Sequence, residues 1–513
     1  MTDTSTFEAE GVTEDTPSSG AAFSGNSVES SQVTKVTTLV PLPVIPEINR
    51  PCFRCYDYTQ RSGKRSFRAG VWWHTLSEQG AEVDRFVCSP LRVEAITSDG
   101  DSDFGRLLRF RNSRGQWREW AMPMAMLRGS GEDMRGELLH LGVEIDPDAY
   151  RQLSRYIQEQ RPERYVTAAT RTGWHGPELF VLPRQNIGRG DAIYQSEATG
   201  ADDFRAGGTL DGWLDSIARF SPGNPTLLLS LAAAFAGPLL CQLQRTGGGL
   251  HWFGDSSTGK STLLAVAASV WGHSFQFVRS WRVTGNGLEG LAAQRNDTLL
   301  ALDEIAEVDP REVGSIIYCL ANGTGKSRAS RTGAARQAKR WRVITLSSGE
   351  LTSSGHMAEG GRQARTGQEI RLLDLPLKRT FGAWDDLHGM AGGRELSDHL
   401  QRATSEHYGH AGPEFVHKLI ESGEASNLPA MLGELIPRFG ESGGQEGRAA
   451  ERLAICALAG ELATIFGLIP ASQGETVAAA VRTVPHLATG SRAWAVRSTK
   501  NSRRHRQLHL PPW

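Results

Sequence analysis

A glycine-rich segment at residues 254–261 has the residue types and spacing of a phosphate-binding loop. It reads Gly-Asp-Ser-Ser-Thr-Gly-Lys-Ser, a pattern in which backbone amides converge on phosphate oxygens at a helix N-terminus. In such a loop Lys260 contacts the β- and γ-phosphates, and the Ser261 hydroxyl is a ligand of Mg²⁺. We therefore expect ATP and Mg²⁺ as ligands. The expected nucleotide contacts are Gly254, Asp255, Ser256, Ser257, Thr258, Gly259, Lys260, Ser261 and Thr262.

The segments on either side of this loop have the patterns that it requires. Residues 248–253 form a short β-prone run before the loop, and residues 261–271 continue it as an apolar helix. The order strand, loop, helix is the setting in which this motif binds phosphate. It indicates a nucleotide site rather than a chance match.

An apolar run that ends in two acids, residues 298–304, follows about forty residues after the loop. An ordinary buried strand can end in the same acids. After a phosphate-binding loop, however, this is where a magnesium-holding Asp and a water-polarising Glu belong. We expect Asp303 to hold the metal with Ser261, and Glu304 to act with Lys260 in catalysis by orienting or deprotonating the attacking water. The acid pair favours hydrolysis over phosphate transfer to another substrate.

A stretch rich in basic residues lies between Glu312 and Glu350, an interval without any acid. It is either a solvated charged loop or a contact with a phosphate backbone. Its place between the metal strand and the next β-strand favours the second interpretation, because in ring ATPases this gap holds the loop that faces the central pore. A Gly-Thr-Gly-Lys-Ser run within it lacks the first glycine of a phosphate-binding loop, so we reject it as a second nucleotide site. The nucleic-acid candidates are Lys326, Arg328 and Arg331.

The next predicted strand, residues 341–346, ends in a polar Ser-Ser-Gly-Glu segment. A polar residue at this tip, for which we choose Ser348, can hydrogen-bond the γ-phosphate or the attacking water. Three arginines follow shortly, Arg362, Arg365 and Arg371, and any of them could serve a neighbouring subunit as an arginine finger. We take Arg365 and Arg371 as the catalytic candidates.

Composition places the chain among globular proteins. Its 513 residues are 39% hydrophobic, which suits two or three domains with substantial cores. The formal net charge is -1, but seven acids against two basic residues in the first fifty positions leave about +4 for the rest. An excess this small indicates a polyanion ligand only where the basic residues cluster, as they do after Glu312.

Cysteine use and hydropathy indicate a cytoplasmic protein without a membrane span. Six cysteines are too few for a disulfide framework, and no apolar leader opens the chain. Cys52 and Cys55 have the spacing of half a zinc site, but no second Cys/His pair follows at the usual distance. The longest apolar run, residues 226–241, is shorter than the roughly 20 residues of a bilayer span, and we expect a buried helix.

Changes of pattern along the chain predict an α/β fold with a P-loop NTPase core. That core is a parallel sheet, preceded by an α+β domain and followed by a helical region. The expected segments are a disordered arm at 1–48, an α+β domain at 49–187, a helical linker at 188–247, the ATPase core at 248–376, a helical region at 377–470 and a basic, poorly ordered tail at 471–513.

Several motifs together resemble a known family, the helicase-like family called domain of unknown function 927. The resemblance extends over residues 68–467 and is carried by residues 280–289, 302–304, 318–328, 346–350 and 367–371. It implies a replicative helicase-type ATPase, related in layout to superfamily 3 and AAA+ rings. Similar proteins are encoded by phages, plasmids and other mobile elements, commonly beside primase modules. The likeness therefore implies a homo-oligomeric ring, single-stranded DNA and a primase or other replication protein as partners.

Two features depart from the family pattern. No primase-like segment is present, and the end after about residue 481 does not resemble the family's helical continuation. The leading hypothesis is an ATP-hydrolysing helicase or translocase that acts on DNA. The alternative is a nucleotide-gated DNA-binding or assembly switch, in replication initiation or defence, without unwinding. A P-loop kinase is disfavoured by Glu304.

Overall fold

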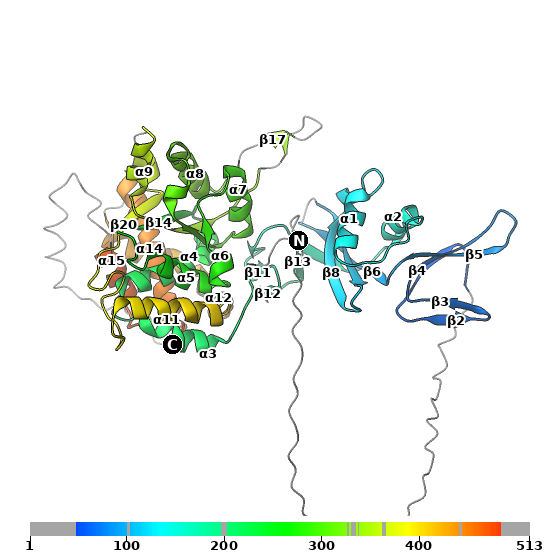
Figure 1. The fold of residues 1–513 in the computed structure, drawn as a ribbon, viewed down its shortest axis with the longest axis horizontal. Coiled ribbons are helices and arrows are strands. Elements are labelled where there is room, and N and C mark those ends of the chain that lie inside the picture. The colour runs from blue at the N-terminus through cyan, green and yellow to red at the C-terminus, as the bar shows by residue number, and fades with distance from the viewer. Residues whose placement is uncertain are drawn as a thin grey trace, which may run out of the picture.

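The structure is a computed structural model, and each element below belongs to the part of the chain that it describes. The described residues are 48–99, 103–195, 203–325, 328–329, 335–336, 338–361, 366–440 and 444–483. The molecule is elongated in Figure 1, with the N-terminal strands at one end and the elements after residue 210 at the other.

The N-terminal part is built on two antiparallel-rich sheets and two helices. The first sheet has the order β1 (Cys52–Tyr56), β4 (Gly70–Leu76) and β5 (Glu82–Cys88), and a separate hairpin joins β2 (Gln60–Ser62) to β3 (Arg65–Phe67). The second sheet has the order β13 (Ala192–Tyr194), β9 (Tyr165–Ala169), β6 (Leu91–Ser98), β7 (Gly105–Arg111) and β8 (Trp117–Pro123). Apolar side chains of both sheets pack with α1 (Glu132–His140) and α2 (Tyr150–Glu159) in one core.

A small sheet connects the N-terminal part to the rest of the chain. It consists of β10 (Gly173–Trp174), β11 (Leu179–Leu182) and β12 (Gln185–Gly188). Trp174 and Phe180 from this sheet lie in the same hydrophobic cluster as residues of the helices after residue 210. After it, β13 pairs with β9, so strand structure continues beyond residue 187, inside the segment that the sequence predicted as a helical linker. The helices in that segment are α3 (Leu210–Ser216) and α4 (Pro225–Gln242).

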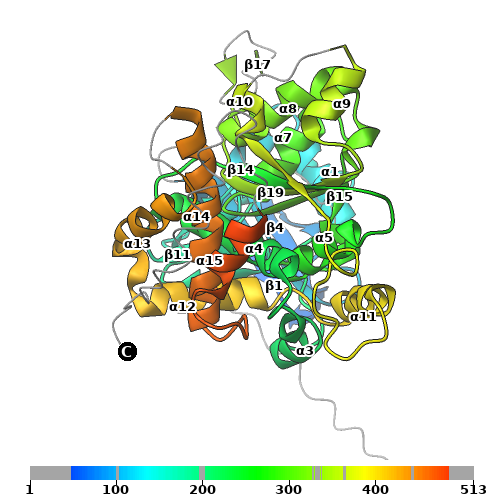
Figure 2. The same ribbon diagram turned by 90° about the vertical axis from the view of Figure 1, so that its left-hand side faces the viewer.

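A five-stranded parallel sheet forms the centre of the second part (Figure 2). Its order is β15 (Arg279–Ser280), β16 (Thr298–Asp303), β19 (Val343–Gly349), β14 (Gly248–Phe253) and β20 (Leu372–Pro376). Strand β19 therefore separates the strand that precedes the glycine loop from the strand that ends in Asp303. Because all five strands are parallel, the residues that follow each strand meet at one edge of the sheet.

Successive side chains of each strand point to opposite faces of this sheet, and both faces are buried. Near-continuous apolar strands are typical of such sheets. Leu299 and Ala301 of β16 lie in one cluster with α4 and α5 (Lys260–Ser269), whereas Leu300 and Leu302 lie in another with α7 (Gly285–Gln294) and α8 (Pro310–Asn322). Shorter helices complete the layers: α6 (Ser274–Phe277), α9 (Ser353–Glu359) and α10 (Thr366–Glu369).

Helix α4 contains the predicted apolar run and is a core helix. It is the one helix among the described residues that is long and apolar enough to cross a membrane, and 89% of it is buried inside the protein. Gly237 of this helix approaches the backbone of Thr298 so closely that a side chain would not fit. The expectation of a buried helix is confirmed.

Helices follow the sheet, as the sequence predicted. They are α11 (Gly393–Glu406), α12 (Ala411–Ser422), α13 (Leu428–Leu435), α14 (Gly444–Ile465) and α15 (Glu475–Thr483). The last of these corrects the prediction of a poorly ordered tail from 471, because Val477, Ala479 and Ala480 are buried in the cluster that contains α4. Residues 484–513 of that predicted tail, and the predicted arm at 1–47, lie outside the described residues.

The basic stretch forms a hairpin. Strands β17 (Arg328–Ala329) and β18 (Ala335–Arg336) pair antiparallel, with Arg328 opposite Arg336. The hairpin lies between the end of α8 and the start of β19, at the edge of the sheet opposite the glycine loop. Figure 1 shows β17 projecting beyond the body of the sheet and its helices.

Candidate functional site

The glycine loop joins β14 to α5, as predicted, and its backbone is set by left-handed residues. Ser257 has a φ of 59° and Gly259 a φ of 99°. A Cβ atom on Gly259 would come within 2.9 Å of the Ala383 side chain. Glycine is required there for both reasons, since the conformation disfavours a side chain and the space does not admit one.

Lys260, the first residue of α5, folds back over the loop. Its side chain is buried, and its ammonium donates hydrogen bonds to the carbonyl oxygens of Gly254 at 2.7 Å and Asp255 at 2.6 Å. A buried ammonium needs such acceptors. The ammonium of Lys260 therefore lies at the centre of the loop. Phosphate oxygens could replace the two carbonyls as its acceptors.

Ser261 and Asp303, the two predicted metal ligands, lie close together. The Ser261 hydroxyl lies 3.3 Å from Oδ1 of Asp303. The same carboxylate oxygen accepts a hydrogen bond from the hydroxyl of Ser348, at the end of β19. Hydroxyl and carboxylate oxygens are the donors that Mg²⁺ prefers, so this pair fits the expected metal.

Ser348 is almost completely buried, with 1% of its surface exposed. Besides its bond to Asp303, its oxygen accepts the backbone N–H of Glu304 at 3.1 Å. These contacts fix the position of both acids. Ser348 therefore orients both acids, and its predicted contact with the phosphate or the attacking water stays a prediction.

Glu304 adopts a left-handed conformation, with a φ of 58° and a ψ of 84°. Its carboxylate accepts the N–H of Ala306 at 3.3 Å and caps a short 3-10 helix, Ile305–Glu307. A non-glycine residue in this region costs about 1 kcal/mol, and such strain concentrates at functional sites. The geometry leaves the second carboxylate oxygen available for a water molecule.

A buried polar group under the loop was not identified from the sequence. His251 of β14 is fully buried, its Nδ1 lies 2.9 Å from the Ser347 hydroxyl, and its Nε2 lies 2.9 Å from the carbonyl of Leu351. The indole N–H of Trp281 also donates to Ser347. Burial lowers the pKa of His251, which favours the neutral ring. The only sequence signal was the presence of Trp281 in the family motif at 280–289.

The segment after β20 lies against the glycine loop and was also not predicted as part of the site. A Cβ atom on Gly382 would lie 2.8 Å from the carbonyl oxygen of Thr258. From α11, the amide of Gln401 donates to the hydroxyl of Thr262 at 3.1 Å. Contacts between segments more than 100 residues apart give no local sequence signal.

Arg371 lies away from the loop of its own chain. It precedes β20, at the opposite edge of the sheet, where its guanidinium stacks 4.1 Å from the ring centre of Tyr318 and donates to Asn322 at 3.2 Å. Arg365, Lys326 and Arg331 lie outside the described residues, and of Arg328 only the backbone is described. The finger and nucleic-acid roles of these residues stay predictions.

Among the described residues, no group of three or more His, Cys, Asp or Glu side chains could hold a metal ion by itself. Cys52 and Cys55 both lie on β1, and burial raises the pKa of the Cys55 thiol, which disfavours the thiolate that a metal would need.

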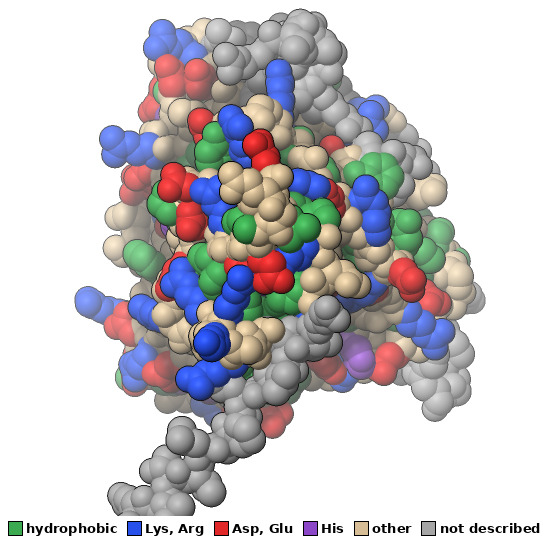
Figure 3. All heavy atoms as spheres, turned by 90° about the vertical axis from the view of Figure 1, so that its right-hand side faces the viewer, with side chains coloured by type: hydrophobic (Ala, Val, Ile, Leu, Met, Phe, Trp, Pro, Cys, Tyr) green, Lys and Arg blue, Asp and Glu red, His purple; other side chains and the backbone are tan. Residues whose placement is uncertain are grey.

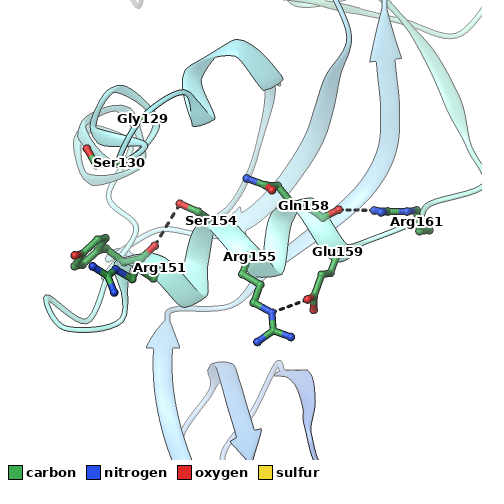
Figure 4. Close-up of a pocket in the computed structure, with 9 residues that line it drawn as sticks. Gly129, Ser130, Arg151, Ser154, Arg155, Gln158, Glu159 and Arg161 are labelled. Carbon is green, nitrogen blue, oxygen red and sulfur yellow. Dashed lines mark hydrogen bonds and ion pairs between the residues drawn. The ribbon is translucent and has the colours of Figure 1, made fainter.

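A cavity of about 720 Å³ lies in the N-terminal part, between α2 and residues 129–130 (Figure 4). Arg151, Arg155 and Arg161 are among its lining residues, and Arg155 pairs with Glu159 at 2.6 Å. None of the predicted nucleotide contacts line it, so it is separate from the loop.

Comparison with solved structures finds a similar fold over most of the chain. A structure described as "SCCmec type IV Cch - active helicase" is 18% identical, with a TM-score of 0.60, over 84% of this chain and 77% of that one. A second structure, "The A form apo structure of NrS-1 C terminal region-CTR", is 10% identical over 67% of this chain and 75% of that one. Its TM-score of 0.28 is too low to support a statement about the fold. The first likeness shows the mixed α/β fold alone.

Comparison with curated proteins finds no match. Comparison with protein families matches residues 62–340, more than half of the chain, to one family. The match includes the glycine loop, both acids and most of the basic stretch. The chain belongs to the family described as Domain of unknown function (DUF927).

Proposed function

We propose that this protein is an ATP-hydrolysing, helicase-like motor that acts on DNA in the replication of a phage, plasmid or other mobile element. The observation that carries the proposal is the meeting of Ser261 and Asp303 beside a loop whose lysine is already buried at its centre. This arrangement supports a P-loop ATPase core. The parallel order of β16, β19 and β14 supports it, because the three strands end at the same edge.

In the proposed site the chain's own groups divide the work. The loop amides and Lys260 bind the β- and γ-phosphates of ATP, and exchange of the ammonium from backbone carbonyls to phosphate keeps its hydrogen bonds satisfied. Ser261 and Asp303 hold Mg²⁺, which when bound neutralises charge on the phosphate oxygens. Ser348 keeps Asp303 oriented.

Glu304 is the proposed group that orients or deprotonates the attacking water. It follows Asp303 directly, and its backbone is fixed by the hydrogen bond to Ser348, so its carboxylate is placed beside the metal-holding acid. A positioned general base of this kind contributes about 10²- to 10⁴-fold to a rate. Its presence supports hydrolysis rather than transfer to a second substrate.

The hairpin β17–β18 is the proposed contact with nucleic acid. It projects from the sheet edge opposite the ATP site, between α8 and β19, and its segment is acid-free. We propose Lys326, Arg328 and Arg331 as contacts to the backbone of single-stranded DNA in the centre of a homo-oligomeric ring. In such a ring Arg365 or Arg371 would reach the ATP site of a neighbour, and a primase or other replication protein would be the partner in the cytoplasm.

The experiment that tests this proposal measures ATP hydrolysis by the full-length protein with and without single-stranded DNA. A motor hydrolyses faster when DNA is bound, because translocation couples the two sites. The Lys260→Ala variant is the control for contaminating activity, since it removes the buried ammonium of the loop.

A second candidate function is a nucleotide-gated switch without strand separation, and one contact favours it. Asp297, immediately before β16, accepts the backbone N–H of Trp174 at 3.1 Å and pairs with Arg342, immediately before β19, at 2.6 Å. One carboxylate thus joins the N-terminal part to the two strands that carry Asp303 and Ser348. ATP could set the arrangement of the two parts through this carboxylate. Unwinding that disappears in Lys260→Ala would rule out the switch-only function.

A further inference from the structure

A second acid-free basic segment occurs in the N-terminal part, at residues 104–118. It contains five arginines and no Asp or Glu. The segment forms β7, a tight turn and the start of β8, so its side chains are placed by a regular antiparallel ladder. Its arginines are Arg106, Arg109, Arg111, Arg114 and Arg118.

The ladder gathers cationic and aromatic side chains on one face of the hairpin. Trp117 stands directly opposite Arg111, and Arg109 lies two residues before Arg111 on the same face. The guanidinium of Arg109 lies 5.2 Å from the centre of the Trp117 ring. Trp117 is nevertheless 38% exposed, which is unusual for so large an apolar side chain. One face of its ring system is therefore available for another planar group.

The positive charge at the tip of the hairpin is uncompensated, although Glu119 stands directly opposite Arg109 farther along the ladder. Arg109 pairs with Glu94 at 3.3 Å. Within the described residues, no carboxylate lies within ion-pair distance of Arg111, Arg114 or Arg118. Arg111 and Arg118 instead donate to the carbonyl of Gly115 and the amide oxygen of Gln116. Figure 3, which faces the N-terminal part, shows many Lys and Arg side chains at that surface, interspersed with acidic ones.

We propose that the tip of the β7–β8 hairpin is a binding site for single-stranded nucleic acid. An unpaired base stacks on Trp117, and Arg111 and Arg114 contact the phosphates that flank it. Base stacking on an exposed aromatic ring together with cations along the backbone is how proteins bind single strands without reading sequence. A duplex cannot use the ring, because its bases are already stacked on each other.

This site goes beyond the proposed motor. Neither the glycine loop nor the β17–β18 hairpin contributes to it, so it binds in the absence of ATP. Figure 1 shows β8 in the N-terminal part, at a distance from β14 and β20 of the ATPase sheet. A nucleic-acid strand bound there is presented to the motor or held beside it, whether or not a nucleotide is bound at the glycine loop.

The test uses the full-length protein without nucleotide and a labelled oligothymidylate of about 20 nucleotides, with binding measured at several salt concentrations. Trp117→Leu should weaken binding about tenfold and leave the slope of log K against log[salt] unchanged, because a ring makes no ion contact. Arg111→Ala with Arg114→Ala should weaken binding and reduce that slope by about 1.4, since each single-strand phosphate contact contributes about 0.7.

The matched control is Arg151→Ala with Arg155→Ala, which removes the same two charges at the α2 cavity. An equal loss in this control would overturn the proposal, because the effect would then be one of net charge. An unchanged affinity in Trp117→Leu would overturn it as well, and so would equal weakening on a duplex or competition by poly-glutamate as strong as by DNA. Trp117 and Arg114 are exposed and Arg111 is half-buried, and thermal unfolding of each variant verifies the fold.

The outcome of this binding test does not depend on whether the protein is a motor. Lys260→Ala should bind the oligothymidylate like the unaltered protein in the absence of nucleotide. If hydrolysis is independent of DNA while Trp117→Leu still loses single-strand binding, the motor proposal is contradicted and the binding-site proposal is supported. If DNA stimulates hydrolysis but all hairpin variants bind the oligothymidylate normally, the motor proposal is supported and the binding-site proposal is contradicted.

Discussion

The hydroxyl of Ser261 lies 3.3 Å from the carboxylate of Asp303, although 42 residues separate them in the chain. Strand β19 lies between the strand that leads to the loop and the strand that ends in Asp303. The parallel sheet brings the ends of all three strands to one edge, so the loop, the acid and Ser348 meet there. The site therefore depends on the order of the strands in the sheet as much as on the sequence of the glycine loop.

Asp303→Asn should lower ATP hydrolysis about 100-fold or more while the protein stays folded. Asparagine still accepts the hydrogen bond of Ser348 but lacks the charge that holds Mg²⁺, and loss of metal stabilisation costs several kcal/mol in the transition state. Steady-state phosphate release measures the effect. Asp309→Asn, an exposed helix-capping acid nearby, is the matched control and should hydrolyse normally. Comparable turnover in both variants would remove Asp303 from the site.

Glu304→Gln should bind ATP with nearly unchanged affinity and hydrolyse it about 10²- to 10⁴-fold more slowly. Glutamine keeps an oxygen that can cap the 3-10 helix at Ala306, so the fold around it is preserved. Equilibrium binding of a fluorescent ATP analogue and single-turnover hydrolysis separate the two effects. Unaltered turnover would show that another residue is the base.

Lys326→Ala with Arg328→Ala should weaken DNA binding and flatten its salt dependence while sparing hydrolysis without DNA. Arg328 begins β17, in the hairpin at the sheet edge opposite the glycine loop, so a contact with DNA there is separate from the proposed ATP site of the same chain. Arg61→Ala with Lys64→Ala, exposed on the β2–β3 hairpin, is the charge-matched control. Loss of hydrolysis without DNA would reassign the cations to the ATP site of a neighbour.

Asp297→Asn should destabilise the protein by about 3 kcal/mol, because it leaves the largely buried Arg342 without its charged partner. Asparagine tolerates the φ of 57° at this position and can still accept the N–H of Trp174, so the loss isolates the ion pair. Chemical denaturation monitored by tryptophan fluorescence gives the free energy. A decrease in the free energy of unfolding of less than about 0.5 kcal/mol, which is typical of surface substitutions, would show that water replaces Asp297 as the partner of Arg342.

His175 should make folding sensitive to acid. Burial lowers its pKa, although its hydrogen bond to the carbonyl of Arg171 acts in the opposite direction. Its folded-state pKa is therefore below that of the unfolded chain, which binds more protons as the pH falls below about 6.5. The contribution of neutral His175 is present above that pH and is lost as the pH falls.

The measurement is the decrease in melting temperature between about pH 7.5 and about pH 5.5. It should be smaller in His175→Gln than in the unaltered protein, whereas the exposed His140 substituted in the same way should leave it unchanged. The same decrease in all three proteins would contradict a role for His175.

Local pattern was sufficient for the elements that carry the expected chemistry. Residues 248–253 and 298–303 are strands because their apolar runs are bounded by a glycine loop and by acids, and α4 is buried because it is apolar on every side. Helix α13 lies within the helical region expected at 377–470, and its Leu428, Leu432 and Leu435 have helical spacing and are buried.

What the sequence did not reveal depends on contacts between distant segments. The small sheet β10–β12 belongs to the large hydrophobic cluster because Trp174 reaches the carbonyl of Pro238, and no local pattern records that contact. The inward position of Ser348 follows from its strand pairing, and the packing of Gly382 on Thr258 follows from the loop after β20. Register and long-range packing decide these positions, and neither has a periodic signature in a single sequence.

The central claim is that ATP hydrolysis at Lys260, Asp303 and Glu304 is coupled to nucleic acid. The most direct test is the rate of phosphate release by the full-length protein as single-stranded DNA is titrated in, with Lys260→Ala measured alongside. The account predicts a several-fold, saturable increase with DNA in the unaltered protein and no hydrolysis above background in Lys260→Ala. A rate that DNA leaves unchanged, together with the absence of salt-sensitive DNA binding, would contradict it.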